Sequence, residues 1–292
     1  MDISLIDAII NALRKHVVDV ILHGSVIEKD DFDEEFSDID ILLIINDKCD
    51  IREVLRALSY LPLDRRIDLS VYWKSFVETE FLKGEPFFGA TILYGKSALN
   101  SEFVKNLRQK GFQFSNYTIY RELVFFSLVI PRIIMDLKDG RIISAVNRSY
   151  HLAKYALATV LMLKSKNLIV RFRDIIRKAL ELGFNSYVSR LIKLRNNRKN
   201  IHNLHDALGY FNDCYDFFYA CLSEYIDFSF KSANEFISKL IDASYVSGKL
   251  DYQSMKLIYM SDEKCREIIL GKFKSVLRRI INEVQKQFKL KI

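Results

Sequence analysis

The stretch SDIDILLI at residues 37–44 decides the fold of the N-terminal part of this chain. It places two carboxylates, Asp38 and Asp40, one residue apart at the start of an apolar run. Alternate residues of a strand point to the same face, so the run predicts a buried strand with the two acids side by side. Like charges that close repel unless a cation neutralises them, and hard divalent cations prefer carboxylate oxygens.

Two further stretches fit the same chemistry. VVDVIL at residues 17–22 predicts a buried strand that leads into Gly24 and Ser25. Glycine lets the backbone approach a ligand closely, and serine adds a hydroxyl and an N–H suited to phosphate. RIDLSVY at residues 66–72 predicts a strand carrying a third acid, Asp68. Three acids would complete a two-metal clamp for phosphoryl or nucleotidyl transfer.

The order of these features resembles the nucleotidyltransferases of the DNA polymerase beta superfamily, most closely its minimal members and the antibiotic nucleotidyltransferases. The resemblance rests on a strand followed by Gly24-Ser25, 12 intervening residues, Asp38-x-Asp40 on a strand, and Asp68 on a later strand. It implies that the glycine and serine hold a triphosphate, and that the three aspartates bind two Mg²⁺ ions. It further implies that Asp68 helps to deprotonate the acceptor hydroxyl.

The resemblance covers roughly residues 1–96 and departs from the family at one point. Minimal members carry a basic Arg-Gly shortly after the serine, where this chain has VIEK at residues 26–29. The loop that follows is acidic, with five Asp or Glu among residues 30–35. We therefore expect either weaker phosphate binding than in the family or a substitute role for Lys29.

The pattern of elements predicts an α/β or α+β nucleotidyltransferase domain with a small mixed sheet over residues 1–98, and an all-α bundle over residues 99–292. In the first domain we expect helices at 3–15 and 51–60 and strands at 17–22, 39–45, 67–73 and 90–95, with turn residues at 81–89. In the second we expect helices at 102–110, 117–138, 142–165, 171–182, 184–205, 207–228, 231–247, 251–259 and 262–289. Pro131 should kink or divide its helix, and Gly209 should mark a break.

The helical part has a resemblance of its own, to HEPN bundles. It is carried by residues 142–165 and by an Arg, six residues and a His, which occurs twice. The candidate residues are Arg195, Arg198, His202 and His205. In active HEPN members such a pair cleaves RNA, but the tyrosine that often accompanies it is missing here. The alternative resemblance is to the helical domain of aminoglycoside nucleotidyltransferases, which completes the acceptor pocket.

Two interpretations of Arg198 and His205 remain open. Both fall along an apolar stripe of a helix expected over residues 184–205 and its continuation. A buried Arg or His needs a partner or a ligand, so they could line an interhelical cleft. Alternatively they lie at the margin of the stripe, with Arg198 snorkelling to water, or make ordinary interhelical hydrogen bonds.

Composition limits the remaining possibilities. No apolar run is long enough to span a membrane, and the first residues lack the basic segment of a signal peptide. Four cysteines without C-x-x-C spacing suggest neither a zinc site nor a disulfide framework, which favours a reduced, cytoplasmic protein. Residues 1–50 carry 13 acids against 4 bases, so the remaining residues carry a net +16 of the chain's total of +7. That basic part could attract nucleotide, nucleic acid or an acidic partner, although solvated helix faces explain most of it.

These observations lead to one functional hypothesis and two alternatives. The hypothesis is a Mg²⁺-dependent nucleotidyltransferase that moves a nucleoside monophosphate, expected to be AMP from ATP, to a hydroxyl acceptor. A small molecule, a protein hydroxyl and an RNA 3′ end all remain open as acceptors, and a homodimer is compatible with the many apolar stripes. The alternatives are a non-catalytic, antitoxin-like module that binds nucleotide or a partner, and a HEPN-type RNase.

Overall fold

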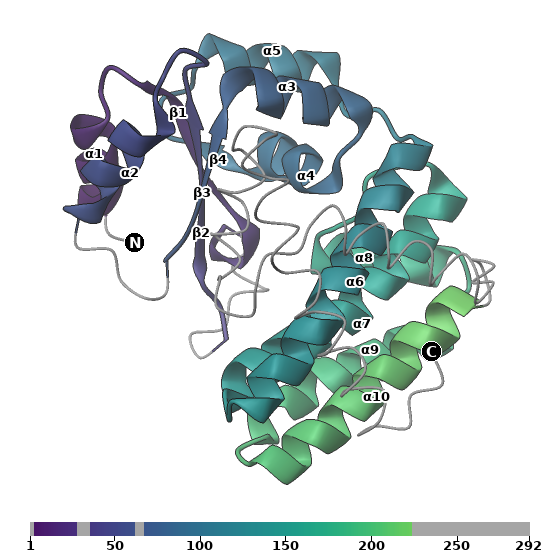
Figure 1. Cartoon of the computed structure of the whole chain (residues 1–292). Coiled ribbons are helices and arrows are strands. Elements are labelled where there is room, and N and C mark those ends of the chain that lie inside the picture. The colour runs from purple at the N-terminus through teal and green to yellow at the C-terminus, as the bar shows by residue number, and fades with distance from the viewer. Residues whose placement is uncertain (1–2, 28–35, 62–66, 224–292) are drawn as a thin grey trace, which may run out of the picture. The chain divides into compact units, whose positions relative to one another are not determined.

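The computed structural model describes residues 3–27, 36–61 and 67–223 (Figure 1). The chain divides into two compact units between Thr118 and Ile119. The first unit contains a four-stranded mixed sheet with helices, and the described part of the second unit is helical. The predicted fold class, a small mixed sheet with helices followed by an all-α part, is therefore confirmed.

The sheet of the first unit has the strand order β3-β2-β1-β4. Its strands are β1 (Val17–His23), β2 (Ile39–Ile45), β3 (Ile67–Trp73) and β4 (Lys96–Ser97). β1 runs antiparallel to β2 and to β4, whereas β2 and β3 are parallel. Parallel neighbours need a crossover, which here includes helix α2 (Ile51–Ser59). The strands expected at 17–22, 39–45 and 67–73 are confirmed.

Helices cover both faces of this sheet, as Figure 1 shows. Helices α1 (Ile3–Ala12) and α2 pack on one face, and α3 (Lys74–Lys83) and α4 (Pro86–Tyr94) contact strands from the other. The core on the α1 and α2 side consists of alternate strand residues and the apolar faces of both helices. Its strand members are Val20, Leu22, Ile41, Leu43, Ile45, Leu69 and Val71. The intervening residues of each strand therefore face α3 and α4.

A buried carboxylate ties β1 to the chain that follows β4. Asp19 is fully buried and accepts hydrogen bonds from the hydroxyls of Ser97 at 2.7 Å and Ser101 at 2.6 Å. It also accepts from the backbone N–H groups of Val20, Leu99 and Ser101. Ser101 in turn caps α5 (Glu102–Lys110). A buried charge is tolerated when it is this fully hydrogen-bonded, so Asp19 is a structural residue.

The strand expected at residues 90–95 is wrong, because most of this segment is the helix α4 and only the two-residue strand β4 follows it. The Glu85 side chain accepts a hydrogen bond from the Phe88 N–H at 2.8 Å, and Pro86 occupies the first helical turn. Both features start a helix, whereas the continuous apolar run that follows does not distinguish helix from strand. α3 was also not expected; it ends at Gly84, whose φ of 91° favours glycine.

The described part of the second unit consists of five α-helices and a short 3₁₀ turn. They are α6 (Asn116–Lys138), which begins in the first unit, α7 (Ile142–Ser165), α8 (Phe172–Glu181), α9 (Asn185–Asn197), the turn η2 (Arg198–Asn200) and α10 (Leu204–Ser223). α7 contacts α8, α9 and α10 and is buried along most of its length. Its many alanines allow the neighbouring helices to approach closely, which makes α7 the core of this unit.

Three expectations about these helices are corrected. α6 runs through Pro131 without division, and Gly209 lies inside α10. The single helix expected over residues 184–205 ends at Asn197. A new helix starts only at Leu204, where the Asn203 side chain accepts a hydrogen bond from the Asp206 N–H at 2.9 Å. Asparagine is a strong N-cap, so this capping favours a second helix over continuation of the first.

Other expectations are confirmed or lie outside the described residues. Within the described ranges, no helix is long and apolar enough to cross a membrane. Cys49, Cys214 and Cys221 are buried free thiols, as predicted. The fourth cysteine and the helices expected at 231–247, 251–259 and 262–289 lie outside the described residues.

Candidate functional site

The predicted acids meet at one end of the sheet, where β1 ends and β2 and β3 begin. His23, the last residue of β1, is the register partner of Asp40 in β2, and Asp40 is the register partner of Asp68 in β3. Residues directly opposite each other on neighbouring strands share a face. The three side chains therefore form a row across three strands, on the face that α3 and α4 cover. We call this region, together with Gly24, the acidic end of the sheet.

Gly24 approaches the carboxylate of Asp40 more closely than any other residue type could. Its φ is +73°, in the left-handed region, and a Cβ built on it would lie 2.2 Å from Asp40 Oδ2. A methyl group at that point would overlap the carboxylate oxygen, so glycine is required on two independent grounds. Ser25 follows in the short 3₁₀ turn η1 (Gly24–Val26) and is half-buried.

The structure thus brings together Gly24, Ser25, Asp40 and Asp68, which lie far apart in the sequence. Asp38 is exposed and precedes the first residue of β2, so it lies at the mouth of this region and not within the strand. Lys29 lies outside the described residues. Of the predicted metal ligands, two are therefore direct neighbours in register and the third is on the segment that leads into them.

The donor set at the acidic end suits a hard divalent cation. Two carboxylates on adjacent strands repel each other, and a cation between them removes that repulsion. Among the described residues, no group of three carboxylate, histidine or cysteine side chains is placed to hold a metal ion. Mg²⁺ is commonly held by one or two carboxylates, with water and substrate phosphates supplying the other ligands. The pair of Asp40 and Asp68 fits that mode of binding.

Aromatic side chains border the acidic end on the α4 side. The imidazole of His23 meets the ring of Phe87 edge to face, with centroids 5.3 Å apart. Phe87 lies 6.3 Å from the ring of Tyr72, which stacks on Phe76 at 5.5 Å. His23 is thus a packed strand-end residue, as the sequence indicated. Phe87 was missed because its segment was interpreted as turns; recognising the Glu85 cap and Pro86 would have placed it on a helix.

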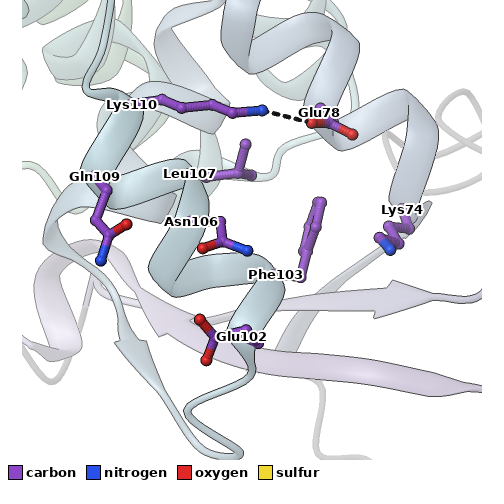
Figure 2. Close-up of a pocket in the computed structure, with 8 residues that line it drawn as sticks. All are labelled: Lys74, Glu78, Glu102, Phe103, Asn106, Leu107, Gln109 and Lys110. Carbon is purple, nitrogen blue, oxygen red and sulfur yellow. Dashed lines mark hydrogen bonds and ion pairs between the residues drawn. The ribbon is translucent and has the colours of Figure 1, made fainter.

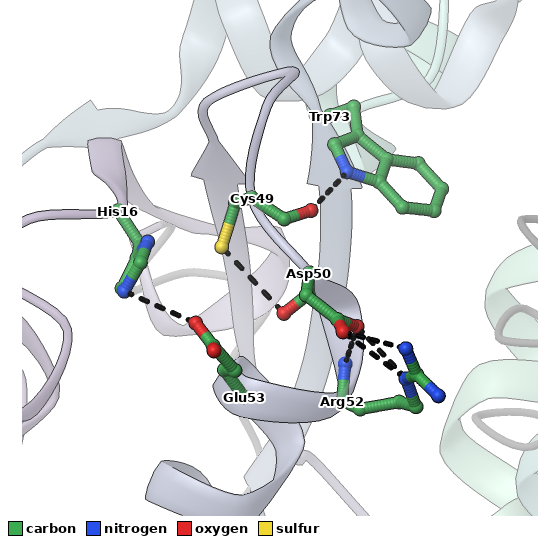
Figure 3. Close-up of polar contacts among 6 residues, drawn as sticks. All are labelled: His16, Cys49, Asp50, Arg52, Glu53 and Trp73. Carbon is green, nitrogen blue, oxygen red and sulfur yellow. Dashed lines mark hydrogen bonds and ion pairs between the residues drawn. The ribbon is translucent and has the colours of Figure 1, made fainter.

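The opposite end of the sheet is built differently (Figure 3). Trp73 Nε1 donates to the backbone oxygen of Cys49 at 3.2 Å, which joins β3 to the start of α2. Asp50 caps α2 by accepting from the Arg52 N–H at 2.9 Å, and the Arg52 guanidinium donates to both carboxylate oxygens. These hydrogen bonds hold the pKa of Asp50 below its usual value. Burial, with the nearby acids Glu53 and Asp50, raises the pKa of the Cys49 thiol, so it stays protonated.

A groove of about 650 Å³ lies between α3 and α5 (Figure 2). Its lining mixes charged, amide and apolar side chains: Lys74, Glu78, Glu102, Phe103, Asn106, Leu107, Gln109 and Lys110. Lys110 pairs with Glu78 at 2.9 Å, and the ammonium of Lys74 lies over the Phe103 ring. Lys74 follows the last residue of β3, whereas Asp68 is near its first, so roughly 20 Å of strand separates the two. The groove is therefore not part of the acidic end.

The candidate residues of the helical unit lie in different environments. Arg198 is buried, with its guanidinium 4.9 Å from the centre of the Tyr150 ring, so it does not snorkel to water. His202 and His205 are exposed. Arg195 stacks on Phe172 at 4.3 Å. Because the helix is interrupted between residues 198 and 203, the stripe that put arginine and histidine on one face does not exist as a continuous feature.

The surroundings of Arg198 are those of a helix-packing site. Tyr210 donates a hydrogen bond to the backbone oxygen of Leu194 at 2.9 Å. Burial raises the pKa of Tyr210 and also that of Cys214, so both stay protonated near neutral pH. The cation of Arg198 opposes the shift at Tyr210. These contacts join η2 and α10 to α7 and favour a structural role for Arg198.

Comparisons with known proteins give one distant likeness. No family model matches this chain, and no curated protein is similar to it. Among solved structures, one that covers 94% of this chain and 90% of its own is described as a nucleotidyltransferase-like protein from Exiguobacterium sibiricum 255-15. The sequence identity is 12% and the TM-score is 0.33. A likeness this weak supports no conclusion about activity.

Proposed function

We propose that this protein is a Mg²⁺-dependent nucleotidyltransferase whose active site is the acidic end of the sheet. The observation that carries the proposal is the close approach of Gly24 to the carboxylate of Asp40, which in turn lies in register with Asp68. This arrangement sets a glycine turn suited to phosphates directly against a pair of carboxylates suited to a cation. Asp19 at the other end of β1 has no such arrangement, because hydroxyl and N–H donors surround it.

The chain's own residues would divide the reaction as follows. Gly24 and Ser25 hold the phosphates of a nucleoside triphosphate, with ATP as the expected substrate. Asp38, Asp40 and Asp68 hold Mg²⁺, and Lys29 contributes positive charge beside the phosphates. The acceptor hydroxyl attacks the α-phosphorus as its proton passes to Asp68; the bond from the α-phosphorus to the bridging oxygen breaks, and pyrophosphate leaves. Bound Mg²⁺ would supply charge stabilisation at the phosphoryl oxygens.

The described residues favour this function over an RNase in the helical unit. A general acid–base pair must reach the same reacting atoms. Arg198 is buried among helices, while His202 and His205 face solvent. The acceptor is a hydroxyl of a small molecule, a protein or an RNA 3′ end.

The experiment is a transfer assay with each α-labelled nucleoside triphosphate, run with Mg²⁺, with and without cell extract. The Asp38→Ala/Asp40→Ala variant is the control. Label that reaches an acceptor only with the wild-type protein supports the proposal and identifies the nucleotide and acceptor class. Absence of transfer, with nucleotide binding intact by calorimetry, would overturn it and favour a non-catalytic nucleotide-binding module.

A further inference from the structure

The second unit contains a cluster of arginines around one buried carboxylate. Asp136, near the end of α6, is fully buried. Arg141 Nη2 lies 2.9 Å from its Oδ1, Arg132 Nε lies 3.9 Å from the same oxygen, and Arg148 is ion-paired with Oδ2. We call Asp136 and these three residues the arginine cluster.

One carboxylate cannot neutralise three guanidinium groups. A buried carboxylate needs a partner, and one bidentate arginine is enough to provide it. The second and third arginines repel the first, and Arg141 shares its charge with Asp139 through a 2.8 Å contact. Even when Asp139 is counted, three cations face two anions. The cluster therefore has positive charge in excess of its own requirements.

Asp136 holds the arginines in place while their outer surfaces stay accessible. The side chains of Arg132, Arg141 and Arg148 are 25%, 46% and 29% exposed, whereas that of Asp136 is 1% exposed. A guanidinium fixed by one anion on its inner side can still donate from its other N–H groups. Arg148 also donates to the Ser144 hydroxyl, which fixes it further. An anion would meet donors whose positions are already determined.

The cluster has a geometry suited to a tetrahedral oxyanion. Arg141, Ser144 and Arg148 follow one another at helical spacing on the first turns of α7, and Arg132 reaches them from α6. Arginine forks match phosphate oxygens well. The described part of the second unit is basic as a whole, because residues 119–223 contain 17 Lys or Arg against 8 Asp or Glu. That charge would raise the local concentration of polyanions.

We infer that the arginine cluster around Asp136 is a binding site for a phosphate group. It lies in the second unit and does not depend on the function proposed for the acidic end of the sheet. Phosphate of that chemistry occurs free, in nucleotides and along a nucleic-acid backbone. The probes of the experiment distinguish these sources.

The test measures binding of three probes to the full chain in EDTA, which prevents metal-dependent binding at the acidic end. The probes are pyrophosphate and ATP, followed by calorimetry, and a fluorescently labelled single-stranded RNA, followed by anisotropy. Arg141→Gln is the variant, since Arg141 is half-exposed and its loss leaves Asp136 with two partners. Arg177→Gln is the matched control, because Arg177 pairs with Asp174 on α8 at 3.0 Å and is 71% exposed.

The expected result is that Arg141→Gln weakens binding of at least one probe by about tenfold, as for loss of a charge-assisted contact, while Arg177→Gln binds like the wild type. For RNA, the slope of log K against log salt should fall by about 1 in the Arg141 variant. Binding of RNA alone identifies a nucleic-acid site, and binding of pyrophosphate or ATP identifies a small-ligand site. Equal effects of the two substitutions, or no wild-type binding of any probe, would overturn the inference.

A second variant separates this role from a purely structural one. Asp136→Asn leaves three guanidinium groups without their central anion. If the cluster binds phosphate, added phosphate should raise the melting temperature of Asp136→Asn by more than that of the wild type, since it replaces the lost charge. If the arginines serve only to neutralise Asp136, phosphate will stabilise both proteins equally, and the inference fails.

Discussion

The two ends of the four-stranded sheet treat carboxylates in opposite ways. Toward one end, Asp19 is buried and accepts five hydrogen bonds, and Asp50 caps α2 and pairs with Arg52. At the acidic end, Asp40 lies in register with another acid, Asp68, and against the turn at Gly24. The first arrangement satisfies each negative charge with donors, whereas the second sets negative charges beside each other.

The difference separates a structural acid from a functional one. Donors fixed by the fold stabilise a carboxylate whether or not a ligand is present. Paired carboxylates remain unfavourable until a cation binds, so the fold keeps them at a cost in stability. Exchanging the properties of the two ends by substitution is therefore the most informative way to examine this molecule.

The largest expected effect is that of Asp40→Ala on activity. We expect nucleotidyl transfer to fall by about 1,000-fold or more, because charge stabilisation worth several kcal/mol is lost with the metal. The melting temperature without metal should stay the same or rise, since a repulsion is removed. Asp47→Ala is the control: Asp47 lies beyond the other end of β2 and accepts from the Ser75 N–H at 2.8 Å. Comparable loss of activity in both variants would contradict the assignment.

Asp19→Ala should have the opposite profile. Its hydroxyl and N–H partners would be left without their acceptor, and we expect the free energy of unfolding to fall by about 3 kcal/mol. Chemical denaturation measures this loss. The exposed Asp7 of α1 is the comparison, and Asp7→Ala should change stability by less than about 0.5 kcal/mol. A stable Asp19→Ala protein would show that the network is not structural.

Gly24→Ala tests the close approach at the acidic end. The positive φ alone should cost about 1 to 2 kcal/mol of stability. Gly183 provides the matched control, since its φ is +79° and an added Cβ would meet nothing within 4 Å. Both variants should lose similar stability by denaturation, but only Gly24→Ala should lose transfer activity. If Gly24→Ala keeps wild-type turnover, the contact with Asp40 has no role in catalysis.

The smallest effect is expected for the cap of α2. The Arg52 guanidinium lowers the pKa of Asp50 from its usual 3.8. The charged form therefore stabilises the fold above pH 3.8, and this contribution disappears as the pH falls through the lower folded value. Asp50→Asn keeps a capping oxygen but removes the charge. Its melting temperature should be slightly below wild type at pH 7, and the difference should vanish in strong acid; a constant difference would exclude the ion pair as its cause.

Much of the first unit could be predicted from local patterns. Runs of β-branched and aliphatic residues predict β1, β2 and β3, and the acids at Asp40 and Asp68 could be placed on neighbouring strands. Their direct register could not, because it depends on how β2 and β3 pair. α4 was mistaken for a strand since a wholly apolar run has no period, and the deciding cap from Glu85 is a side-chain hydrogen bond.

The second unit shows the same limit from another direction. α7 matches its predicted range, yet the adjoining helix breaks before residue 204 because Asn203 caps a new one. The arginine cluster had no local signal, since Arg132, Asp136 and Arg148 lie four and twelve residues apart and meet only when α6 and α7 fold back on each other. Side-chain convergence of that kind is decided by tertiary packing.

The central claim is that Asp40 and Asp68 together bind a divalent cation. The most direct measurement is a Mn²⁺ titration followed by electron paramagnetic resonance, with a non-hydrolysable ATP analogue present, for the wild type and Asp40→Asn/Asp68→Asn. The account predicts that the wild type binds Mn²⁺ and that the double variant, folded as judged by circular dichroism, does not. Equal Mn²⁺ binding by the two proteins would contradict it.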